Sequence, residues 1–531
     1  MKTEKILVAD PISPKGVEVL RANPRFVVDV KTGLKEDALC QIIGEYDALI
    51  VRSQTKVTAR VIEAASRLRV IGRAGVGVDN VDVDAATKRG IIVMNTPGGN
   101  TISTAEHTFS LMLALARNIP QACASIKAGQ WDRKSFEGTE LFNKTLGIIG
   151  MGRIGGEVAR RAIAFGMRVL AYDPFLSLSR AKALQVEVVE LDDVFTRADF
   201  ITVHVPLTDQ TRGMINRDTI RKMKKGVRLI NCARGGIICE ADLAEAIREG
   251  HVAGAALDVF EIEPPPADWP LRGLPQVIAT PHLGASTHEA QETVGIEIAH
   301  QIADVLEGGT IRNAVNMPSL DAKTLALLQP FLSLGEKLGR LVAQLAAGRT
   351  ERLTVEFRGK ATELETDPVT RAVLRGFLVS AEGADVNYVN APVIAAQLGI
   401  EVGEIKSSES TEFTELITVT VQGEKGTTSV AGTFYGARTL PRIVRINGMP
   451  VEAVPEGILF IMRNKDRPGV VGWIGTILGR NQVNIAGMAL SRDHVGGEAL
   501  TVLNLDSKPA PQLIAEIQSD PDIRDVKVAE L

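Results

Sequence analysis

Arg234, Glu263 and His282 lie in three short motifs, NCARGG, DVFEIEPPP and TPHLGAST. A guanidinium can hold a carboxylate through two parallel N–H bonds. An imidazole titrates near neutral pH and can take the proton of a hydroxyl group, and a carboxylate beside it raises its basicity. Each residue alone also has a structural explanation, but the three follow successive predicted strands. Together they indicate a site that grips an α-hydroxy carboxylate and moves its proton while a hydride leaves.

The segment GMGRIG places Gly150, Gly152 and Gly155 between the strand-like run TLGIIG and a helical stretch that begins near Ile154. Glycines at this spacing allow a tight turn and close approach of a dinucleotide pyrophosphate. The N-terminus of the following helix favours that anion through its free N–H groups and its dipole. A purely structural turn can have the same letters, but the strand before and the helix after favour a dinucleotide site.

Asp173 ends the next strand-like run, MRVLAYD, at the distance from the glycines that is typical of a ribose ligand. A carboxylate there accepts both ribose hydroxyls and repels a 2′-phosphate, which predicts NAD rather than NADP. Arg153, inside the glycine motif, would help to hold the pyrophosphate and weakens the exclusion of NADP slightly. The structural alternative for Asp173 is a cap at the end of the strand.

Cations outside the trio predict a substrate with a second anionic group. VRSQT supplies Arg52 and Ser53 at the end of an early strand, GRAGVGVDN supplies a turn at Gly75, and WDRKSF adds Arg133 and Lys134. A phosphate or a second carboxylate would bind to such cations. The alternative for Arg133 and Lys134 is a solvated charge pair ahead of the glycine motif.

Alternation of short β-rich runs with helical stretches predicts an α/β protein with two doubly wound, Rossmann-like lobes. We expect a substrate-binding lobe over 1–98 and 287–318, with the helix AQETVGIEIAHQIADVLEG as the returning segment, and a NAD-binding domain over 99–286. An α+β intervening domain follows over 319–453. Residues 454–531 read strand, helix, strand, strand, helix, strand, the ferredoxin-like βαββαβ order.

Composition predicts a soluble, multidomain protein. A chain of 531 residues is too long for one core, and its net charge of -4 gives no sign of a nucleic-acid or membrane partner. No run of about 18 apolar residues predicts a spanning helix, and the N-terminus lacks a signal-peptide pattern. Cys40, Cys123, Cys232 and Cys239 have neither metal nor disulfide spacing, so we expect no metal and a reducing cytoplasm.

The motifs NCARGG, ALDVFEIEPP and TPHLGAST, downstream of GMGRIG and YDP, resemble those of the D-2-hydroxyacid dehydrogenase family. The resemblance implies catalysis in a cleft between two lobes, with His282 as acid/base, Glu263 as its partner and Arg234 as the carboxylate clamp. It further implies cofactor contacts at Ile154, Val205, Cys232, Ala233, Asp258 and Gly284, and substrate contacts at Val76 and Asn100.

The C-terminal runs RNKDRPGVVGWIG and VNIAGM resemble an ACT domain, and the segment before them, with NAPVIA and GTFYG, resembles the intervening domain of long-form D-3-phosphoglycerate dehydrogenases. The resemblance implies oxidation of 3-phosphoglycerate to 3-phosphohydroxypyruvate, the first step of serine synthesis, by a homo-oligomer (a dimer or tetramer). ACT domains of this family pair across subunits and often bind L-serine, and the matching positions are Asn464, Asp466 and Asn484. The alternative is a purely structural or dimerising ACT domain.

Two further functions stay open. A glyoxylate or hydroxypyruvate reductase, or another D-2-hydroxyacid dehydrogenase, would share the trio, but the long C-terminal part argues against it. A non-catalytic, NAD-sensing interaction protein, like the transcriptional co-repressors that resemble these dehydrogenases, could also retain the trio. Two folded C-terminal modules in place of a disordered extension argue against that function.

Overall fold

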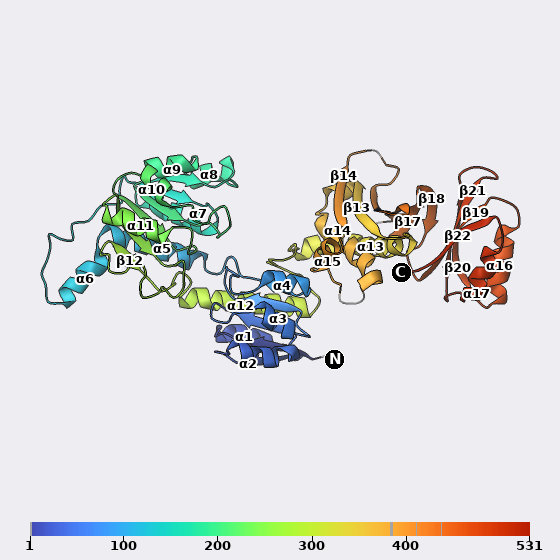
Figure 1. The fold of residues 1–531 in the computed structure, drawn as a ribbon, viewed down its shortest axis with the longest axis horizontal. Helices are drawn as coiled ribbons and strands as arrows, with labels where there is room; N and C mark the ends of the chain where they lie inside the picture. Colours follow the sequence, from blue (N-terminus) through green and yellow to red (C-terminus); the bar gives the residue numbers. More distant parts are fainter. Residues whose placement is uncertain (1–2, 383–385, 410, 437) are drawn as a thin grey trace.

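Four β-sheets follow one another in a computed structural model that describes residues 3–382, 386–409, 411–436 and 438–531. Figure 1 shows an elongated arrangement, with the second sheet (green) on the left, the first (blue) below the centre and the last two on the right. The first two sheets are parallel, the third is mixed and the fourth is antiparallel. The predicted fold class is confirmed.

The first sheet has the strand order β2-β1-β3-β4-β5. Its inner strands are almost wholly apolar because helices cover both faces of a parallel sheet. Its elements are β1 (Glu4–Val8), α1 (Pro14–Arg21), β2 (Phe26–Val30), α2 (Glu36–Ile42), the 3-10 helix η1 (Ile43–Glu45), β3 (Ala48–Val51), α3 (Ala59–Ala64), β4 (Val70–Arg73), α4 (Val83–Lys88) and β5 (Ile92–Met94).

Helix α12 (His288–Leu306) brings the chain back to this lobe, as the sequence predicts. It lies against α1 and β4, and two glycines allow the close approach. A Cβ at Gly16 would lie 2.4 Å from the carbonyl oxygen of Gly295, and one at Gly72 would lie 2.7 Å from the Ile298 side chain. We call the first sheet with α12 the substrate lobe.

The second sheet has the order β12-β11-β10-β9-β6-β7-β8, with the direction of winding reversed at β6. Ligands of such sheets bind where the order reverses, outside the carboxyl ends of the strands. Its elements are α5 (Thr101–Ala116), α6 (Ile119–Lys127), β6 (Thr145–Ile149), α7 (Arg153–Ala164), β7 (Arg168–Tyr172), α8 (Leu178–Leu184), β8 (Glu187–Val188), α9 (Leu191–Arg197), β9 (Phe200–Val203), α10 (Arg217–Lys222), β10 (Val227–Asn231), α11 (Glu240–Arg248), β11 (Val252–Leu257) and β12 (Val277–Ala279).

The third sheet has the order β14-β13-β15-β16-β17-β18 and packs on the long helix α13. Helices α13 and α14 cross closely, since a Cβ at Gly339 or Gly376 would lie 2.0 Å from a carbonyl oxygen of the other helix. Its elements are α13 (Ala322–Leu345), β13 (Thr350–Gly359), the 3-10 helix η2 (Lys360–Glu363), α14 (Asp367–Glu382), α15 (Ala391–Gln397), β14 (Glu401–Ser407), β15 (Glu415–Gly423), β16 (Gly426–Tyr435), β17 (Leu440–Ile446) and β18 (Met449–Ala453).

The fourth sheet has the antiparallel order β20-β21-β19-β22, which is that of a ferredoxin-like βαββαβ unit. Its apolar core joins strand residues such as Phe460 to the two helices. Its elements are β19 (Ile458–Lys465), α16 (Val470–Arg480), β20 (Ile485–Arg492), β21 (Glu498–Leu505), α17 (Pro511–Gln518) and β22 (Ile523–Glu530).

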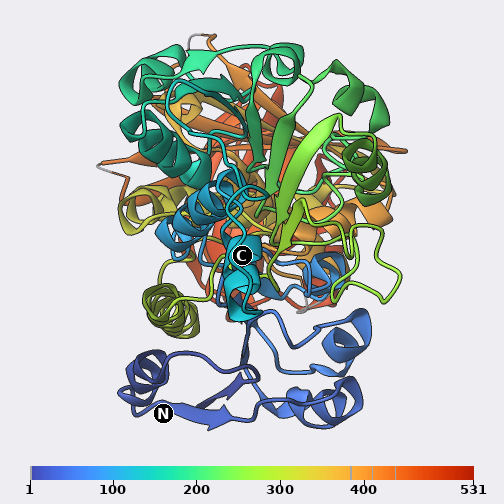
Figure 2. The same cartoon turned by 90° about the vertical axis from the view of Figure 1, so that its left-hand side faces the viewer.

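The four predicted domain ranges remain a prediction, and their boundaries fall outside the strands of all four sheets. Figure 2 shows most of the substrate lobe (blue) as a layer of its own beneath the other sheets. Among the residues described, none of the helices has the length and hydropathy that a membrane crossing requires.

Candidate active site

His282 and Glu263 form a hydrogen-bonded pair beyond the carboxyl ends of β12 and β11. His282 Nδ1 lies 2.8 Å from Glu263 Oε2, and the second carboxylate oxygen accepts the Phe260 N–H at 3.2 Å. His282 has a left-handed φ of 56°, in the turn that follows β12. In the part of the chain that the structure describes, no protein group is hydrogen-bonded to Nε2 of this ring. An imidazole that donates through Nδ1 therefore offers the lone pair of Nε2 as a base.

The hydrogen bond between His282 and Glu263 shifts the pKa of both side chains. The hydrogen bond with Glu263 raises the pKa of His282 above its ordinary value, against the opposing effect of burial. Burial alone would raise the pKa of Glu263, but the hydrogen bond and charge of the imidazole outweigh it and the pKa lies below its ordinary value. Glu263 is therefore ionised at neutral pH and strengthens His282 as a proton acceptor.

Arg234 follows β10 and reaches toward the substrate lobe. Its Nε donates to Oδ2 of Asp79 at 3.1 Å, and its Nη1 donates to the carbonyl of Ala233 at 2.7 Å. A Cβ at Gly77 would lie 1.8 Å from Nη2, so a larger residue there would displace this guanidinium. Nη2 has no hydrogen-bond partner among the described residues, and this terminal nitrogen remains for a ligand carboxylate.

Arg73, which the sequence analysis missed, adds a third arginine to the same region. It ends β4, and its Nε is buried without a hydrogen-bond partner among the described residues. Burial, together with the positive charges of Arg234 and Arg52, lowers the pKa of Arg73 to about 10. A cation held beside two others is stabilised by any anion that enters. The signal was present in GRAG, where the arginine comes directly before the glycine turn.

A cavity of about 530 Å³ joins these residues; Arg52, Ser53, Arg73, Gly75, Glu263 and His282 line it. The buried carboxylate of Asp10 fixes the position of Arg52, since its Oδ2 accepts the Arg52 backbone N–H at 2.6 Å. Glu263 and His282 therefore meet the predicted first-lobe residues Arg52, Ser53 and Gly75 at this cavity, whereas Arg234 lines the cavity next to it. Cavity volume alone would not identify this site, because a larger cavity of about 700 Å³ lies against the opposite side of the substrate lobe.

A second cavity, of about 400 Å³, adjoins the first at His282 and lies along the carboxyl ends of β6, β9, β10 and β11. It is lined by Arg234 and by these predicted cofactor or substrate contacts: Val76, Asn100, Ile154, Val205, Cys232, Ala233, Asp258 and Gly284. Burial raises the pKa of Cys232 to about 12, so its thiol is a neutral part of the wall. The cavity lies where the strand order predicts a dinucleotide.

His204 also lines this second cavity and was not predicted. Burial lowers the pKa of His204 to about 4, which keeps its ring neutral at physiological pH. Its Nε2 lies 3.1 Å from Thr202 Oγ1, and its buried Nδ1 has no partner among the described residues. The motif HVP directly after a strand was the available signal.

The glycine turn fits a pyrophosphate. Gly150 has a φ of 97°, and a Cβ at Gly155 would lie 2.1 Å from the carbonyl oxygen of Gly150, so the turn and the start of α7 require glycine. A Cβ at Gly152 would meet no atom within 4 Å, which leaves open space in front of the helix. Arg153 is the first residue of α7, and the first turn of this helix has no acidic residue. These features leave room and positive potential for an anion.

Asp173 lies directly beyond β7 and supports the same turn. Its Oδ2 accepts the Met151 N–H at 2.7 Å, and its Oδ1 accepts the Phe175 N–H at 2.8 Å. Each carboxylate oxygen has a further lone pair for a hydroxyl group. The ribose role of Asp173 and its structural role as a cap are therefore compatible.

Asp258 holds the turn that carries His282. This buried carboxylate accepts the Leu283 and Gly284 N–H groups, each at 2.8 Å, and lies 3.1 Å from His107 Nε2. Burial would raise the pKa of Asp258, but these hydrogen bonds and that of the Thr280 hydroxyl outweigh it, and the pKa lies below its ordinary value. Although Asp258 lines the second cavity, the contacts shown make it a positioning residue for the turn.

Arg133 and Lys134 are not brought to the cavity of their own chain. They lie on the exposed loop that follows α6, where the Lys134 backbone N–H donates to Asp132 Oδ1 at 3.1 Å. In Figure 1 this helix and its loop extend from the left of the molecule. Their predicted contact with substrate therefore does not arise within a single chain.

The predicted effector residues do not form one site within a chain either. Asn464 is level with Arg492 in the fourth sheet, because both pair with Ala499, whereas Asn484 precedes Ile485, which pairs with Leu505 at the other end. The register separates the two ends by roughly 20 Å.

Each predicted effector side chain also has a partner within its own chain. Asn464 is buried and accepts the Thr501 hydroxyl at 2.9 Å. Asp466 Oδ2 accepts from Arg492 at 2.7 Å, and the Asn484 amide donates to Asp506 at 2.7 Å. A ligand that contacts all three would have to compete with these bonds.

Comparisons with known proteins agree with this geometry. The family model of the NAD-binding domain of D-isomer-specific 2-hydroxyacid dehydrogenases matches residues 109–284. The D-lactate dehydrogenase from Aquifex aeolicus, solved in complex with NAD and lactic acid, is 29% identical, with a TM-score of 0.53 over 60% of this chain and all of that one. The TT0316 protein from Thermus thermophilus is 36% identical, with a TM-score of 0.55 over 59% of this chain and 99% of that one. Fold, trio and cofactor cradle define an NAD-dependent D-2-hydroxyacid dehydrogenase.

The rest of the chain narrows this class. Residues 327–447 match the intervening domain of D-3-phosphoglycerate dehydrogenase, and residues 458–522 match the ACT domain. The D-3-phosphoglycerate dehydrogenase of Archaeoglobus fulgidus is 46% identical over 99% of this chain and 100% of its own length, and that of Bacillus subtilis is 45% identical over 99% of both. The chain belongs to the D-3-phosphoglycerate dehydrogenase family.

Proposed function

We propose that this protein oxidises the 2-hydroxyl group of 3-phospho-D-glycerate to the ketone of 3-phosphohydroxypyruvate, with NAD as cofactor, as the first step of serine synthesis. One observation carries the proposal: the His282–Glu263 pair lies where the cofactor cavity meets a cavity lined by Arg52 and Arg73. That arrangement places a base between a hydride acceptor and cations that suit a phosphorylated acid.

The proton and the hydride of the substrate go to two different acceptors. Nε2 of His282 takes the hydroxyl proton, and the carboxylate of Glu263 stabilises the imidazolium that forms. The glycine turn and Asp173 would hold NAD, whose chemistry when bound would be to accept a hydride from C2. The carbon loses one hydride and the oxygen one proton, so the alcohol becomes a ketone.

The arginines divide the two anionic groups of the substrate between them. Arg234 binds the carboxylate through Nη2, beside the backbone of the Gly75–Gly77 turn, because Nε and Nη1 each already donate to a protein acceptor. Arg52 and Arg73 bind the phosphate from the substrate lobe. Since the trio comes from one lobe and these cations from the other, closure of the lobes aligns C2 and excludes water.

A homo-oligomer completes this proposal. On the arm formed by α6 and the loop after it, Trp131 is 83% exposed next to Arg133, and Ile119 and Ile126 are also exposed. Apolar side chains gathered on an extended arm favour contact with a second copy of the chain. Such a contact would carry Arg133 and Lys134 toward the cavity of a partner, where they would add to the phosphate site.

The proposed effector is L-serine, bound between paired ACT domains of two chains. Asn464 and Asp466 of one chain would meet Asn484 of another, since one chain holds them at opposite ends of its sheet. A cytoplasmic location is part of the same proposal and is supported by the free state of Cys40, Cys123, Cys232 and Cys239.

Substrate choice tests the function. The purified full-length chain should form NADH from 3-phospho-D-glycerate with a kcat/KM about tenfold to a hundredfold above that for D-glycerate, because charge-assisted bonds to the phosphate contribute about 1.5–3 kcal/mol. Arg52→Gln should remove most of this preference. Arg60→Gln, which deletes an exposed arginine of the same lobe outside the cavity, should leave it intact.

Two results would count against the proposal in different ways. Equal turnover of both acids would contradict the phosphate role of Arg52 while leaving the dehydrogenase chemistry in place. NAD binding without NADH formation from any D-2-hydroxy acid would contradict the enzymatic function itself.

A further inference from the structure

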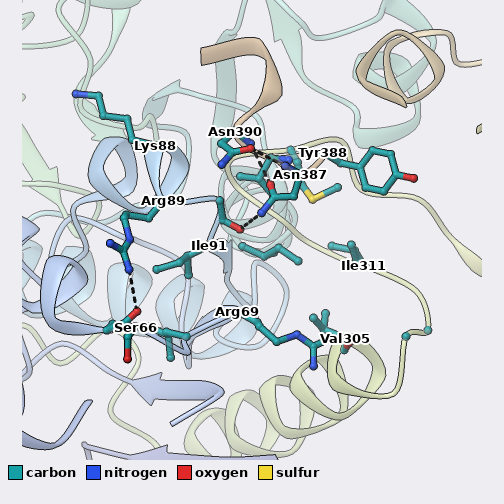
Figure 3. A pocket seen from close by; sticks show the side chains of 18 residues that line it. Ser66, Arg69, Lys88, Arg89, Ile91, Val305, Ile311, Asn387, Tyr388 and Asn390 are labelled. Carbon is teal, nitrogen blue, oxygen red and sulfur yellow. Dashed lines mark hydrogen bonds between the residues drawn. The ribbon is translucent and has the colours of Figure 1, made fainter. Parts of the chain in front are cut away.

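A cavity of about 700 Å³ lies between the substrate lobe and the intervening domain, away from the catalytic trio. We call it the seam cavity; Arg69, Lys88 and Arg89 line it from the lobe, Val305 from α12, and the turn 387–390 from the intervening domain. Figure 3 shows this turn above Ile91, with Arg89 and Arg69 below it on either side. The cavity is thus walled by two parts of the chain that fold as separate sheets.

A direct hydrogen bond holds its two walls together. The Asn387 side-chain amide donates to the carbonyl of Gly90 at 2.9 Å. Gly90 has a φ of 69°, and a Cβ there would lie 2.1 Å from Asn387 Nδ2, so the contact depends on glycine. Oδ1 of Asn387 accepts the Val389 and Asn390 N–H groups and fixes the turn. The substrate lobe and the intervening domain are therefore joined by specific hydrogen bonds, which fix the walls of the seam cavity.

The lining of the seam cavity is positively charged. Arg69, Lys88 and Arg89 are all exposed, and no Asp or Glu is among the described residues that line the cavity. Among the described residues, the Arg89 side chain donates only to the carbonyl of Ala65, at 3.4 Å. Arg69 has one carboxylate neighbour, Glu4 Oε1, at 3.4 Å. These long contacts leave several guanidinium donors without a strong acceptor.

Lys88 lies at the rim of the cavity. It has no ion-pair partner in the described ranges of the chain, and Figure 3 shows its side chain extended away from the two arginines. Lys88 therefore adds to the positive electrostatic potential of the cavity and makes no specific ion pair among the described residues. Two arginines with spare planar donors, and a lysine near them, form a site for phosphate or carboxylate.

An apolar pocket of about 210 Å³ continues the seam cavity. Both are lined by Gly308, Gly309, Ile311, Met317 and Tyr388. Beyond these shared residues the smaller pocket is lined mainly by aliphatic side chains and prolines, such as Leu320 and Leu332. A ligand that fills both spaces has an anionic end and an apolar body.

Strand β4 connects the seam cavity to the candidate active site. Arg69 directly precedes β4 and lines the seam cavity, whereas Arg73 ends β4 and lines the catalytic cavity. The strand is roughly 13 Å long and lies inside the sheet, between β3 and β5. A ligand at the seam would therefore contact the start of the strand whose end carries Arg73, the arginine proposed to bind substrate.

We infer that the seam cavity binds a small organic anion, a phosphate or carboxylate monoanion or dianion with an apolar body, whose charged end lies between Arg69 and Arg89. The inference does not depend on the proposed substrate. It assigns to the substrate lobe and the intervening domain of one chain a binding site separate from the trio.

Isothermal titration calorimetry of the full chain with NADH bound provides the test. Phenyl phosphate should bind at the seam, and inorganic phosphate should bind more weakly because it leaves the apolar pocket empty. Arg89→Gln should weaken the binding of phenyl phosphate at least about tenfold, since a charge-assisted bond is lost. This exposed arginine has only a backbone acceptor, so its loss should leave the melting temperature unchanged. Arg69→Gln provides a second variant with the same expected loss.

Arg60→Gln is the matched control, because it removes an exposed arginine from the same lobe outside the cavity. Equal binding to R89Q, R69Q and R60Q would overturn the inference. So would binding that is lost in R52Q and retained in R89Q, since this result would place the anion in the catalytic cavity. Equal affinity for phenyl phosphate and inorganic phosphate would overturn the assignment of the apolar body.

Discussion

At the residue scale, proton transfer depends on which nitrogen of His282 is free. Glu263 fixes the ring by accepting at Nδ1, which leaves Nε2 as the base, and it raises the pKa of His282. Asp258 fixes the backbone of the turn that carries His282, since it accepts the N–H groups of Leu283 and Gly284. The geometry of one base thus depends on two carboxylates.

Glu263→Gln should lower kcat for 3-phospho-D-glycerate oxidation by about 10²-fold or more, because the imidazolium loses its counter-charge. Oxidation requires neutral His282, so activity rises with pH through the pKa of this residue. Since Glu263 raises that pKa, its loss should move the acidic limb of the kcat/KM profile to lower pH. A pH–rate profile of both proteins measures this, and a limb that stays in place or moves to higher pH would contradict the pairing.

At the scale of elements, the glycine turn between β6 and α7 determines how closely the cofactor can approach. Gly155 and Gly156 are neighbours in α7 with opposite constraints. A Cβ at Gly155 would lie 2.1 Å from the Gly150 carbonyl, whereas a Cβ at Gly156 would meet only Leu184, at 3.9 Å. Packing therefore requires glycine at position 155, whereas at position 156 a substitution would change only the helix propensity.

Gly155→Ala should cost about 1–3 kcal/mol through overpacking and raise the Kd for NADH about tenfold or more. Gly156→Ala should leave the Kd unchanged and stabilise the chain by about 0.5–1 kcal/mol, because alanine loses less backbone entropy in a helix. Fluorescence titration with NADH and thermal unfolding measure both effects. Similar behaviour of the two variants would contradict the close packing of β6 on α7.

Sequence patterns predicted elements and chain order better than they predicted which side chains meet. Glu263 and His282 could be paired in advance because parallel strands in order bring successive carboxyl ends to one edge. The motif GRAG places Arg73 before the glycine turn, but its burial beside Arg52 and Arg234 could not be predicted because these residues are distant in sequence. Arg133 was placed near the substrate from its charge alone, whereas the structure puts it on an exposed arm.

At the scale of the whole molecule, the substrate lobe touches both the NAD-binding domain and the intervening domain. The first contact includes the Arg234–Asp79 ion pair, and the second includes the Asn387–Gly90 hydrogen bond. A change at either contact can therefore reach the strands between them. An effector alters turnover only if the protein binds that effector with different affinities in the open and closed arrangements of the lobes.

Asn387→Ala should loosen the contact between the substrate lobe and the intervening domain, because the bond to Gly90 and the acceptor within the turn are both lost. Hydrogen exchange should become faster over 88–92 and 387–390. Asn481→Ala, which removes a side-chain bond inside the ACT helix region, is the control and should leave both segments unchanged. Unchanged exchange in the N387A variant would show that other contacts hold the seam.

The central claim is that His282 is the base of a hydride-transfer reaction on a phosphorylated 2-hydroxy acid. The most direct measurement is turnover of 3-phospho-D-glycerate by His282→Ala, with the Kd for NADH measured on the same preparation. The kcat of this variant should fall by about 10²–10⁴-fold, because the hydroxyl proton loses its acceptor, while the Kd for NADH changes little. Turnover that persists, or a loss of NADH binding as large as the loss of kcat, would contradict it.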